Sequence, residues 1–205
     1  TFTNDHNLFD SIRGATVSIK PNGINPQSTD AQSLTAFNTN GFSVGTSTTV
    51  NTDSQSFVAW SLKAGGVPGA TNSNTSGAMA ADSVSLDGVL QSAYTPSGSP
   101  TIYPQKMSIN TESGFSIIEY KGIGGGAGNT VPHGLSVAPD MVIIRSVAEF
   151  ANWPSLMRPY MGNQLNSTAA GNNAGTSTNA FNDTLPTSTL VTLGSDAEVN
   201  GLNKI

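Results

Sequence analysis

The sequence of 205 residues contains no cysteine, which excludes disulfide bonds and thiolate metal sites. Charged residues are scarce, at 10% compared with about 25% in an ordinary soluble domain. The 8 Lys and Arg residues form no cluster that could neutralise phosphates, so we expect no nucleic-acid partner. No apolar run reaches the roughly 18 residues that a membrane helix needs, so we expect no membrane insertion.

Serine, threonine, asparagine and glycine take the place of the missing charged residues. Hydrophobic residues make up 36% and the formal net charge is −5, whereas a disordered chain usually combines low hydrophobicity with high net charge. A neutral polar surface of this kind is typical of a β-structure covered by Thr and Asn rather than of a charged helical enzyme. The composition therefore predicts an all-β protein.

The densest β pattern lies at residues 115–145. Two apolar runs, at 115–120 and 141–145, flank a Gly-rich connection, and we expect two strands joined by that connection. Residues 33–37 predict at most one helical turn. Shorter apolar or alternating runs predict further strands at residues 15–20, 41–45, 56–63, 83–86 and 188–193.

Proline and glycine interrupt the polar runs of residues 65–108, where only residues 83–86 predict a strand. We interpret this part as a long extended Pro/Gly/Ser-rich excursion, which either contacts a neighbouring subunit or acts as a mobile linker. It separates two expected modules. Residues 1–64 would be the C-terminal part of a first β module, and residues 109–205 a second β module that lacks its last strand.

Short motifs recur in the same order in both expected modules, which we interpret as an internal repeat. The matching pairs are Ala36-Phe37-Asn38 with Ala180-Phe181-Asn182, Phe42-Ser43-Val44-Gly45 with Val191-Thr192-Leu193-Gly194, and Val50-Asn51 with Val199-Asn200. The first pair is offset by 144 residues (180 − 36) and the other two by 149 (194 − 45). Only the first copy includes the strand expected at 56–63, and only the second includes residues 115–145, so we expect the biological chain to continue in both directions.

Several glycines follow the strand expected at 115–120, and they are Gly122, Gly124, Gly125, Gly126 and Gly128. A phosphate-binding loop needs a Gly-Lys-Ser/Thr sequence or a glycine-rich turn that leads into a helix. Here Asn129-Thr130-Val131-Pro132 follows, and this sequence cannot open a helix properly. We therefore expect a hairpin or bulge connection and no cofactor.

No arrangement of residues predicts catalysis. His133, Ser136 and Asp140 lie in one short turn without an evident oxyanion hole, so we expect His133 to hydrogen-bond the loop before the next strand instead of activating a nucleophile. Carboxylate pairs for glycoside cleavage would arise only through tertiary folding. The acids available for such a pair are Glu112, Glu119, Glu149, Glu198 and the aspartates.

Metal sites are equally unsupported. With His6 and His133 as the only histidines and no cysteine, the sequence has too few zinc ligands. The aspartates lack the spacing of a calcium-binding loop. We therefore assign no catalytic, cofactor-binding or metal site, and we expect no enzymatic activity.

The aromatic residues divide into two groups. We expect core anchors at Trp60, Trp153, Phe37, Phe181, Phe115 and Tyr120, and the repeat gives Phe37 and Phe181 the same place in the two copies. Tyr94, Tyr103 and Tyr160 lie in stretches rich in Pro, Gly and Ser, where they can be exposed. Exposed aromatic faces suit both sugar binding and subunit contacts.

Six segments together resemble a repeat domain of structural and tail-fibre proteins from marine tailed phages, including cyanophages. The segments are residues 40–46 (Asn-Gly-Phe-Ser-Val-Gly-Thr), 57–66 (Phe-Val-Ala-Trp-Ser-Leu-Lys-Ala-Gly-Gly), 114–122 (Gly-Phe-Ser-Ile-Ile-Glu-Tyr-Lys-Gly), 133–145 (His-Gly-Leu-Ser-Val-Ala-Pro-Asp-Met-Val-Ile-Ile-Arg), 152–154 (Asn-Trp-Pro) and 183–188 (Asp-Thr-Leu-Pro-Thr-Ser). The resemblance spans nearly the whole chain. In that family the Gly-rich connection and the His-Gly-Leu turn repeat with the module.

The resemblance implies antiparallel β-sandwich-like modules in tandem, with strands passed between adjacent modules or subunits, in fibres that are commonly homotrimers. It also implies a structural protein of the virion, an extracellular particle. The protein would be a tail fibre or tail appendage that contacts other virion proteins and adheres to host-surface glycans. The alternative is a capsid decoration protein or other virion appendage, and a tailspike that cleaves glycans is the rival from the enzyme class. The resemblance identifies no catalytic residue in this chain.

Overall fold

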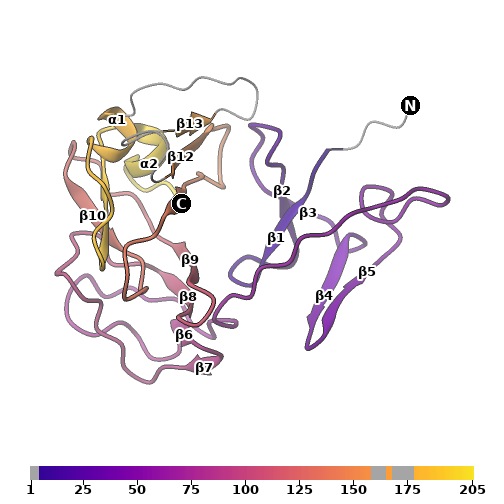
Figure 1. Ribbon diagram of the computed structural model, residues 1–205, viewed down its shortest axis with the longest axis horizontal. Helices are drawn as coiled ribbons and strands as arrows, with labels where there is room; N and C mark the ends of the chain where they lie inside the picture. Colours follow the sequence, from indigo (N-terminus) through magenta and orange to yellow (C-terminus); the bar gives the residue numbers. More distant parts are fainter. Residues whose placement is uncertain (1–4, 158–164, 168–177) are drawn as a thin grey trace.

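The computed structural model describes residues 5–157, 165–167 and 178–205. Regular structure in these residues consists of short strands and two four-residue helices, which confirms the predicted all-β class. Figure 1 shows the strands before residue 45 as one group and the strands after residue 83, with both helices, as a second group. No helix in these ranges has the length and apolar character to span a membrane.

The N-terminal group contains a three-stranded sheet and a hairpin. The strands are β1 (Leu8–Asp10), β2 (Gly14–Ile19) and β3 (Ser28–Thr29) in the sheet, and β4 (Leu34–Asn38) and β5 (Gly41–Val44) in the hairpin. The strands β2 and β5 match the expected ranges. Residues 33–37, expected as a helical turn, lie mostly in β4, because pairing with β5 sets Phe37 opposite Phe42 and holds the chain extended.

Residues 65–108 pack against the same chain. They supply part of a four-stranded sheet with the order β7-β6-β8-β9, whose strands are β6 (Val84–Leu86), β7 (Val89–Leu90), β8 (Lys106–Asn110) and β9 (Phe115–Glu119). The pair β6 and β8 is parallel. The buried Asn72 side chain donates to Pro104 O at 2.8 Å and accepts from Ala80 N at 2.9 Å. A Cβ on Gly65 would lie 1.9 Å from Ile109 O, so this approach requires glycine.

The stretch 115–145 contains three strands in three different sheets, so the prediction of two strands joined by one connection is wrong. Between β9 and β11 (Met141–Ile143), the chain forms β10 (Asn129–Pro132), which pairs with β14 (Leu190–Leu193). Pairing with so distant a strand is set by tertiary contact. The remaining elements are β12 (Trp153–Met157) and β13 (Leu165–Ser167), which continue the sheet of β11, and the helices α1 (Thr178–Phe181) and α2 (Ala197–Asn200).

Two apolar clusters form the core of the larger group. One consists of Ile102, Val131, Leu156, Ala180, Phe181, Val191, Leu193 and Val199, and the other of Met79, Val84, Met107, Ile109 and Leu135. Ile118 of β9 packs against both clusters and therefore joins them. Three residues of the second cluster, Met79, Val84 and Met107, come from the Pro/Gly/Ser-rich stretch, which explains its ordered placement.

The expected aromatic anchors are only partly confirmed. Phe181 and Trp153 are buried, and the hydroxyl of Tyr120 donates to Val199 O at 2.6 Å beside the first cluster. The expectation is wrong for Phe37 and Trp60, whose exposed fractions are 45% and 85%. Phe115 is half-buried, and so are Tyr94 and Tyr103. Tyr160 lies outside the described residues.

The strand expected at residues 56–63 is absent. The alternating sequence has the residues that favour a strand, but no strand in the described ranges lies beside it. Its only hydrogen bond in those ranges is the one that Lys63 O accepts from the Ser113 hydroxyl at 2.8 Å, and it makes no ladder bond there. An extended segment becomes a strand only when a neighbour supplies ladder hydrogen bonds. Figure 1 shows this part of the chain crossing between the two groups as coil.

The two groups meet at the loop after β2. Trp153 Nε1 donates to Gly23 O at 3.0 Å, and the guanidinium of Arg145 lies 5.4 Å from the Trp153 ring centroid. The same guanidinium donates to Ile24 O and Asn25 O, each at 2.7 Å. Two backbone hydrogen bonds add to this joint, from Gln27 N to Val147 O at 2.9 Å and from Ala151 N to Ile24 O at 3.1 Å.

Two segments share a set of backbone hydrogen bonds, and we call them the N-terminal frame (residues 32–51) and the C-terminal frame (residues 179–200). In the N-terminal frame the bonds run from Gly45 N to Ser33 O (2.8 Å), Ser47 N to Gln32 O (2.8 Å), Val50 N to Ser47 O (3.2 Å) and Asn51 N to Ser47 O (2.9 Å). In the C-terminal frame they run from Gly194 N to Ala180 O (2.7 Å), Asp196 N to Asn179 O (2.8 Å), Val199 N to Asp196 O (3.2 Å) and Asn200 N to Asp196 O (3.0 Å).

The hydrogen bonds change one detail of the sequence comparison. Gly45 and Gly194 correspond at the offset of 149, but their partners Ser33 and Ala180 correspond at an offset of 147 (180 − 33). Leu34, and not Phe37, therefore occupies the place of Phe181. Both of these residues are buried, at 7% and 0% exposed, whereas Phe37 lies in the exposed hairpin.

Candidate functional site

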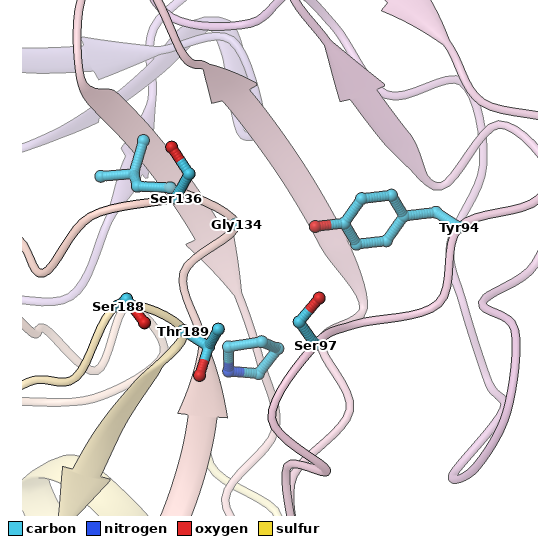
Figure 2. Close-up of a pocket in the computed structure, with 8 residues that line it drawn as sticks. Tyr94, Ser97, Gly134, Ser136, Ser188 and Thr189 are labelled. Carbon is cyan, nitrogen blue, oxygen red and sulfur yellow. The ribbon is translucent and has the colours of Figure 1, made fainter.

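A cavity of about 290 Å³ lies where the loop after β10, the loop before β14 and the turn near residue 95 meet (Figure 2). We call it the hydroxyl cavity. It is lined by Tyr94, Ser97, Pro132, Gly134, Leu135, Ser136, Ser188 and Thr189. No lining residue is charged, and five of the eight carry a hydroxyl group.

His133 and Gly134 hold one wall of the cavity in place. The backbone at Gly134 has a φ of +74°, and a Cβ there would lie 2.4 Å from Ile109 Cδ1, so this position requires glycine. The His133 N–H donates to Thr189 O at 3.2 Å. The loop after β10 is thereby fastened to the loop before β14, which supplies the opposite wall.

The His133 ring is buried and both of its nitrogens are engaged. Nδ1 accepts from the Leu135 N–H at 3.1 Å, and Nε2 lies 3.1 Å from Thr187 O. Because a carbonyl oxygen only accepts, Nε2 carries the proton and the ring is neutral. Burial lowers the pKa of His133, although the bond to Thr187 O opposes this effect. The residue was expected to tie down the neighbouring loop, and its contact with Leu135 N does so.

Some of the hydroxyl groups that line the cavity are available to a ligand, whereas that of Thr189 contacts the Thr187 hydroxyl at 3.4 Å. Figure 2 shows the hydroxyl of Tyr94 pointing toward Gly134 across the open space. Within the described chain, the side chains of Tyr94, Ser97 and Ser188 make no hydrogen bond to the protein. Burial raises the pKa of Tyr94, so its hydroxyl stays protonated at neutral pH and can donate. Uncharged donors and acceptors around an aromatic ring suit a neutral, hydroxyl-bearing ligand such as a sugar.

The structure does not assemble the imagined hydrolase triad. Ser136 and Asp140 are exposed, and no hydrogen bond joins either side chain to His133 in the described part of the chain. A nucleophile would need a base within hydrogen-bond distance, and both His133 nitrogens already have backbone partners. The contacts of His133 therefore fasten a loop.

The glutamates named for glycoside cleavage have other partners. Glu198 Oε1 accepts from Asn152 N and Nδ2 at 2.9 and 2.7 Å. The other three face lysines, with Glu112 near Lys63, Glu119 near Lys106 and Glu149 near Lys204. Among the residues that the structure describes, no group of three or more His, Cys, Asp and Glu could hold a metal ion.

The Gly-rich loop turns the chain and presents carbonyl oxygens to neighbouring side chains. Gly124, Gly125, Gly126 and Gly128 all have positive φ. Asn129 Nδ2 donates to Gly124 O and Gly126 O, both at 3.1 Å. A phosphate site instead needs converging N–H groups at the start of a helix, and a strand follows this loop.

A second notable surface is the segment at residues 56–62. It exposes Phe57, Val58, Trp60 and Leu62 to solvent at 48%, 74%, 85% and 72%. Sequence reasoning had placed these residues in a strand or in the core. Soluble monomers rarely expose large contiguous apolar patches, and where such a patch occurs it usually marks an interaction site.

Sequence reasoning identified only part of the hydroxyl cavity. Tyr94 was singled out as an aromatic residue in a polar stretch, and Ser136 only as a member of a rejected triad. Ser97, Ser188 and Thr189 carried no signal, because single hydroxyl residues in a chain rich in Ser and Thr have no distinguishing pattern. Their proximity depends on the pairing of β10 with β14, which joins segments about sixty residues apart.

The fold and the cavity define an all-β protein of small sheets with an uncharged, hydroxyl-lined hollow. The sequence matches the family described as Domain of unknown function (DUF7483) over residues 1–102 and 92–205, so the chain belongs to that family. Each matched stretch contains one of the two frames. No curated protein and no solved structure matches the chain.

Proposed function

We propose that this chain is part of a structural protein of a phage virion, a tail fibre or tail appendage that adheres to the host surface. The observation that carries the proposal is the pair of frames, which repeat four backbone hydrogen bonds at nearly constant spacing. A repeated β unit builds an elongated protein by adding copies along one chain. The resemblance of six segments to a repeat domain of phage fibre proteins points to the same role.

The surface chemistry agrees with adhesion to neutral glycans. The chain has few charges, and its hydroxyl cavity offers Tyr94, Ser97 and Ser188 without competing protein partners. An uncharged surface limits nonspecific electrostatic attraction before the particle reaches its host. The role proposed for this chain is contact with the glycan, without cleavage.

Labelling of intact particles tests the location. Antibodies raised against this chain and tagged with gold would be applied to phage particles that carry the protein, followed by electron microscopy. We expect the gold at the tail or its fibres. Gold confined to the capsid surface would replace the proposal with a capsid decoration protein, and absence from the particle would reject a virion role.

An incubation with host polysaccharide tests the absence of chemistry. The purified chain is mixed with capsular or surface polysaccharide from the host, and the polymer length is followed by size-exclusion chromatography. We expect unchanged polymer length together with retention of the chain on immobilised polysaccharide. Shortening of the polymer would instead support a glycan-cleaving tailspike.

A further inference from the structure

Residues 56–62 present apolar side chains to solvent on a segment that has no ladder partner. Trp60 is 85% exposed, and Val58 and Leu62 exceed 70%. In the described chain no backbone hydrogen bond reaches any residue from 56 to 62. Val, Phe and Trp favour strands, so local preference and unpaired backbone together make this segment a strand edge that another chain can extend.

We propose that residues 55–61 pair antiparallel with the same residues of a second copy of this chain, about a two-fold axis at Val58. This pairing sets Val58 opposite Val58 of the second copy and places a large side chain opposite a small one on either side. The facing pairs are Phe57 with Ala59, Trp60 with Ser56, and Gln55 with Ser61. Antiparallel strands place directly opposite residues on the same face, so each pair is in contact.

Charge at the ends of the segment is complementary in this arrangement. Asp53 precedes the segment and Lys63 follows it, with no charged residue between them. Antiparallel pairing about Val58 brings Lys63 to the end where Asp53 of the second copy lies. Lys63 is free for such a contact, because its side chain is 75% exposed and its ion pair with Glu112 is long, at 3.8 Å.

The apolar area of the segment corresponds to a small interface. Phe57, Val58, Trp60 and Leu62 together present on the order of 500 Å² of apolar surface, since one aromatic side chain alone has ~150–250 Å². A stable interface buries about 800 Å² on each partner. Two copies that each bury about 500 Å² would share roughly 1,000 Å² in total, which is the size of a small or transient interface. A second copy fits this patch as such a partner.

This inference concerns how the chain assembles, and it stands or fails independently of where the protein lies on a virion. It adds to the proposed structural role, because pairing of residues 55–61 would join two copies of the chain through a segment that has no strand partner within one copy. The homotrimer implied by the family resemblance differs from it, since pairing about a two-fold axis gives two copies.

The solution mass of the chain gives the first test. Light scattering coupled to size-exclusion chromatography is expected to give twice the monomer mass of 21.0 kDa. Hydrogen exchange by mass spectrometry is expected to show protection of amides 56–62 that increases with protein concentration. A monomer at every concentration overturns the inference, as does a trimer in which these amides exchange freely.

Placing a charge at Val58, on the proposed two-fold axis, gives the sharper test. Val58→Lys and Val58→Glu each place two like charges opposite one another, and each variant is expected to be monomeric. Because Val58 is 74% exposed, neither change should alter the urea midpoint of the monomer. An equimolar mixture is expected to recover the doubled mass. If the mixture stays monomeric, or if either single variant still doubles, pairing about Val58 is rejected.

Two further variants separate strand pairing from general stickiness. Ala59→Pro removes a backbone N–H and restricts the chain, so it is expected to abolish the doubled mass while the apolar side chains remain. Phe150 is 70% exposed outside the segment, so Phe150→Lys serves as the matched control and should leave the doubled mass unchanged. An effect of Phe150→Lys equal to that of Val58→Lys would contradict the assignment of the interface to residues 55–61.

Discussion

The N-terminal and C-terminal frames have the same backbone hydrogen bonds but very different surroundings. In the C-terminal frame Phe181, Val199 and Asn200 are buried in or beside the first apolar cluster. In the N-terminal frame Leu34 is also buried, but Val50 is half-buried and Asn51 is exposed. The comparison shows that the frame itself depends on local residues, whereas its contribution to stability depends on what packs against it.

The largest expected difference concerns the apolar side chains. Phe181→Ala should lower the free energy of unfolding by about 3–5 kcal/mol because it opens a cavity in the first cluster. Phe37→Ala, at the residue that the sequence motifs alone match with Phe181, should lower it by less than about 1 kcal/mol, since Phe37 is 45% exposed. Urea unfolding measures both. Equal losses would mean that the hairpin of β4 and β5 is covered in solution.

The second comparison concerns the asparagine that ends each frame. Asn200 accepts from Ile123 N at 3.1 Å and donates to Gly124 O at 3.1 Å. Asn200→Ala leaves these groups unpaired in a buried place and should cost about 2 kcal/mol, whereas Asn51→Ala should cost less than about 1 kcal/mol because water replaces its contacts. Urea unfolding of the two variants tests this ratio, and a larger cost for Asn51→Ala would contradict it.

A smaller difference is expected at the residue that caps the turn. The Asp196 side chain accepts from Glu198 N at 2.9 Å, as an N-cap does, whereas the Ser47 hydroxyl contacts the Thr49 hydroxyl at 3.1 Å. Asp196→Ala should therefore cost about 1 kcal/mol, and Ser47→Ala less. Thermal unfolding compares the two. The Asp196→Asn variant, which keeps the acceptor, should recover most of the loss.

The smallest expected effect is a dependence of stability on pH. Burial lowers the folded-state pKa of His133 below its usual 6.5, so the unfolded chain binds the proton more readily. Stability contributed by neutral His133 is therefore present above about pH 6.5 and is lost as the pH falls below that value. The urea concentration at the midpoint of unfolding should therefore decrease when the pH is lowered from about 7.5 to about 5.5.

Replacing each histidine in turn shows which of them causes the pH dependence of stability. His133→Gln should remove much of the change in midpoint with pH, and His6→Gln, in the N-terminal group, should retain it. Since His6 is exposed, it serves as the matched control. An unchanged dependence in His133→Gln would mean that other groups cause it.

Sequence patterns located several strands, including β2, β5, β6 and β9, because their alternating or β-rich residues are local signals. They missed β10, whose four residues become a strand through pairing with β14. They also placed Trp60 in the core and overlooked Ser97 and Ser188. These failures share a physical cause, since burial and proximity depend on partners that are distant in sequence.

The amino-acid sequence by itself determined the β class, the scarcity of charge, the glycine turns and the order of the repeated motifs. Each of these follows from residue type or from short local patterns. Only the tertiary structure decided that residues 65–108 join the core, that three loops enclose the hydroxyl cavity, and that Trp60 lies in solvent. Such outcomes depend on which surfaces meet, and short-range sequence patterns carry no information about distant contacts.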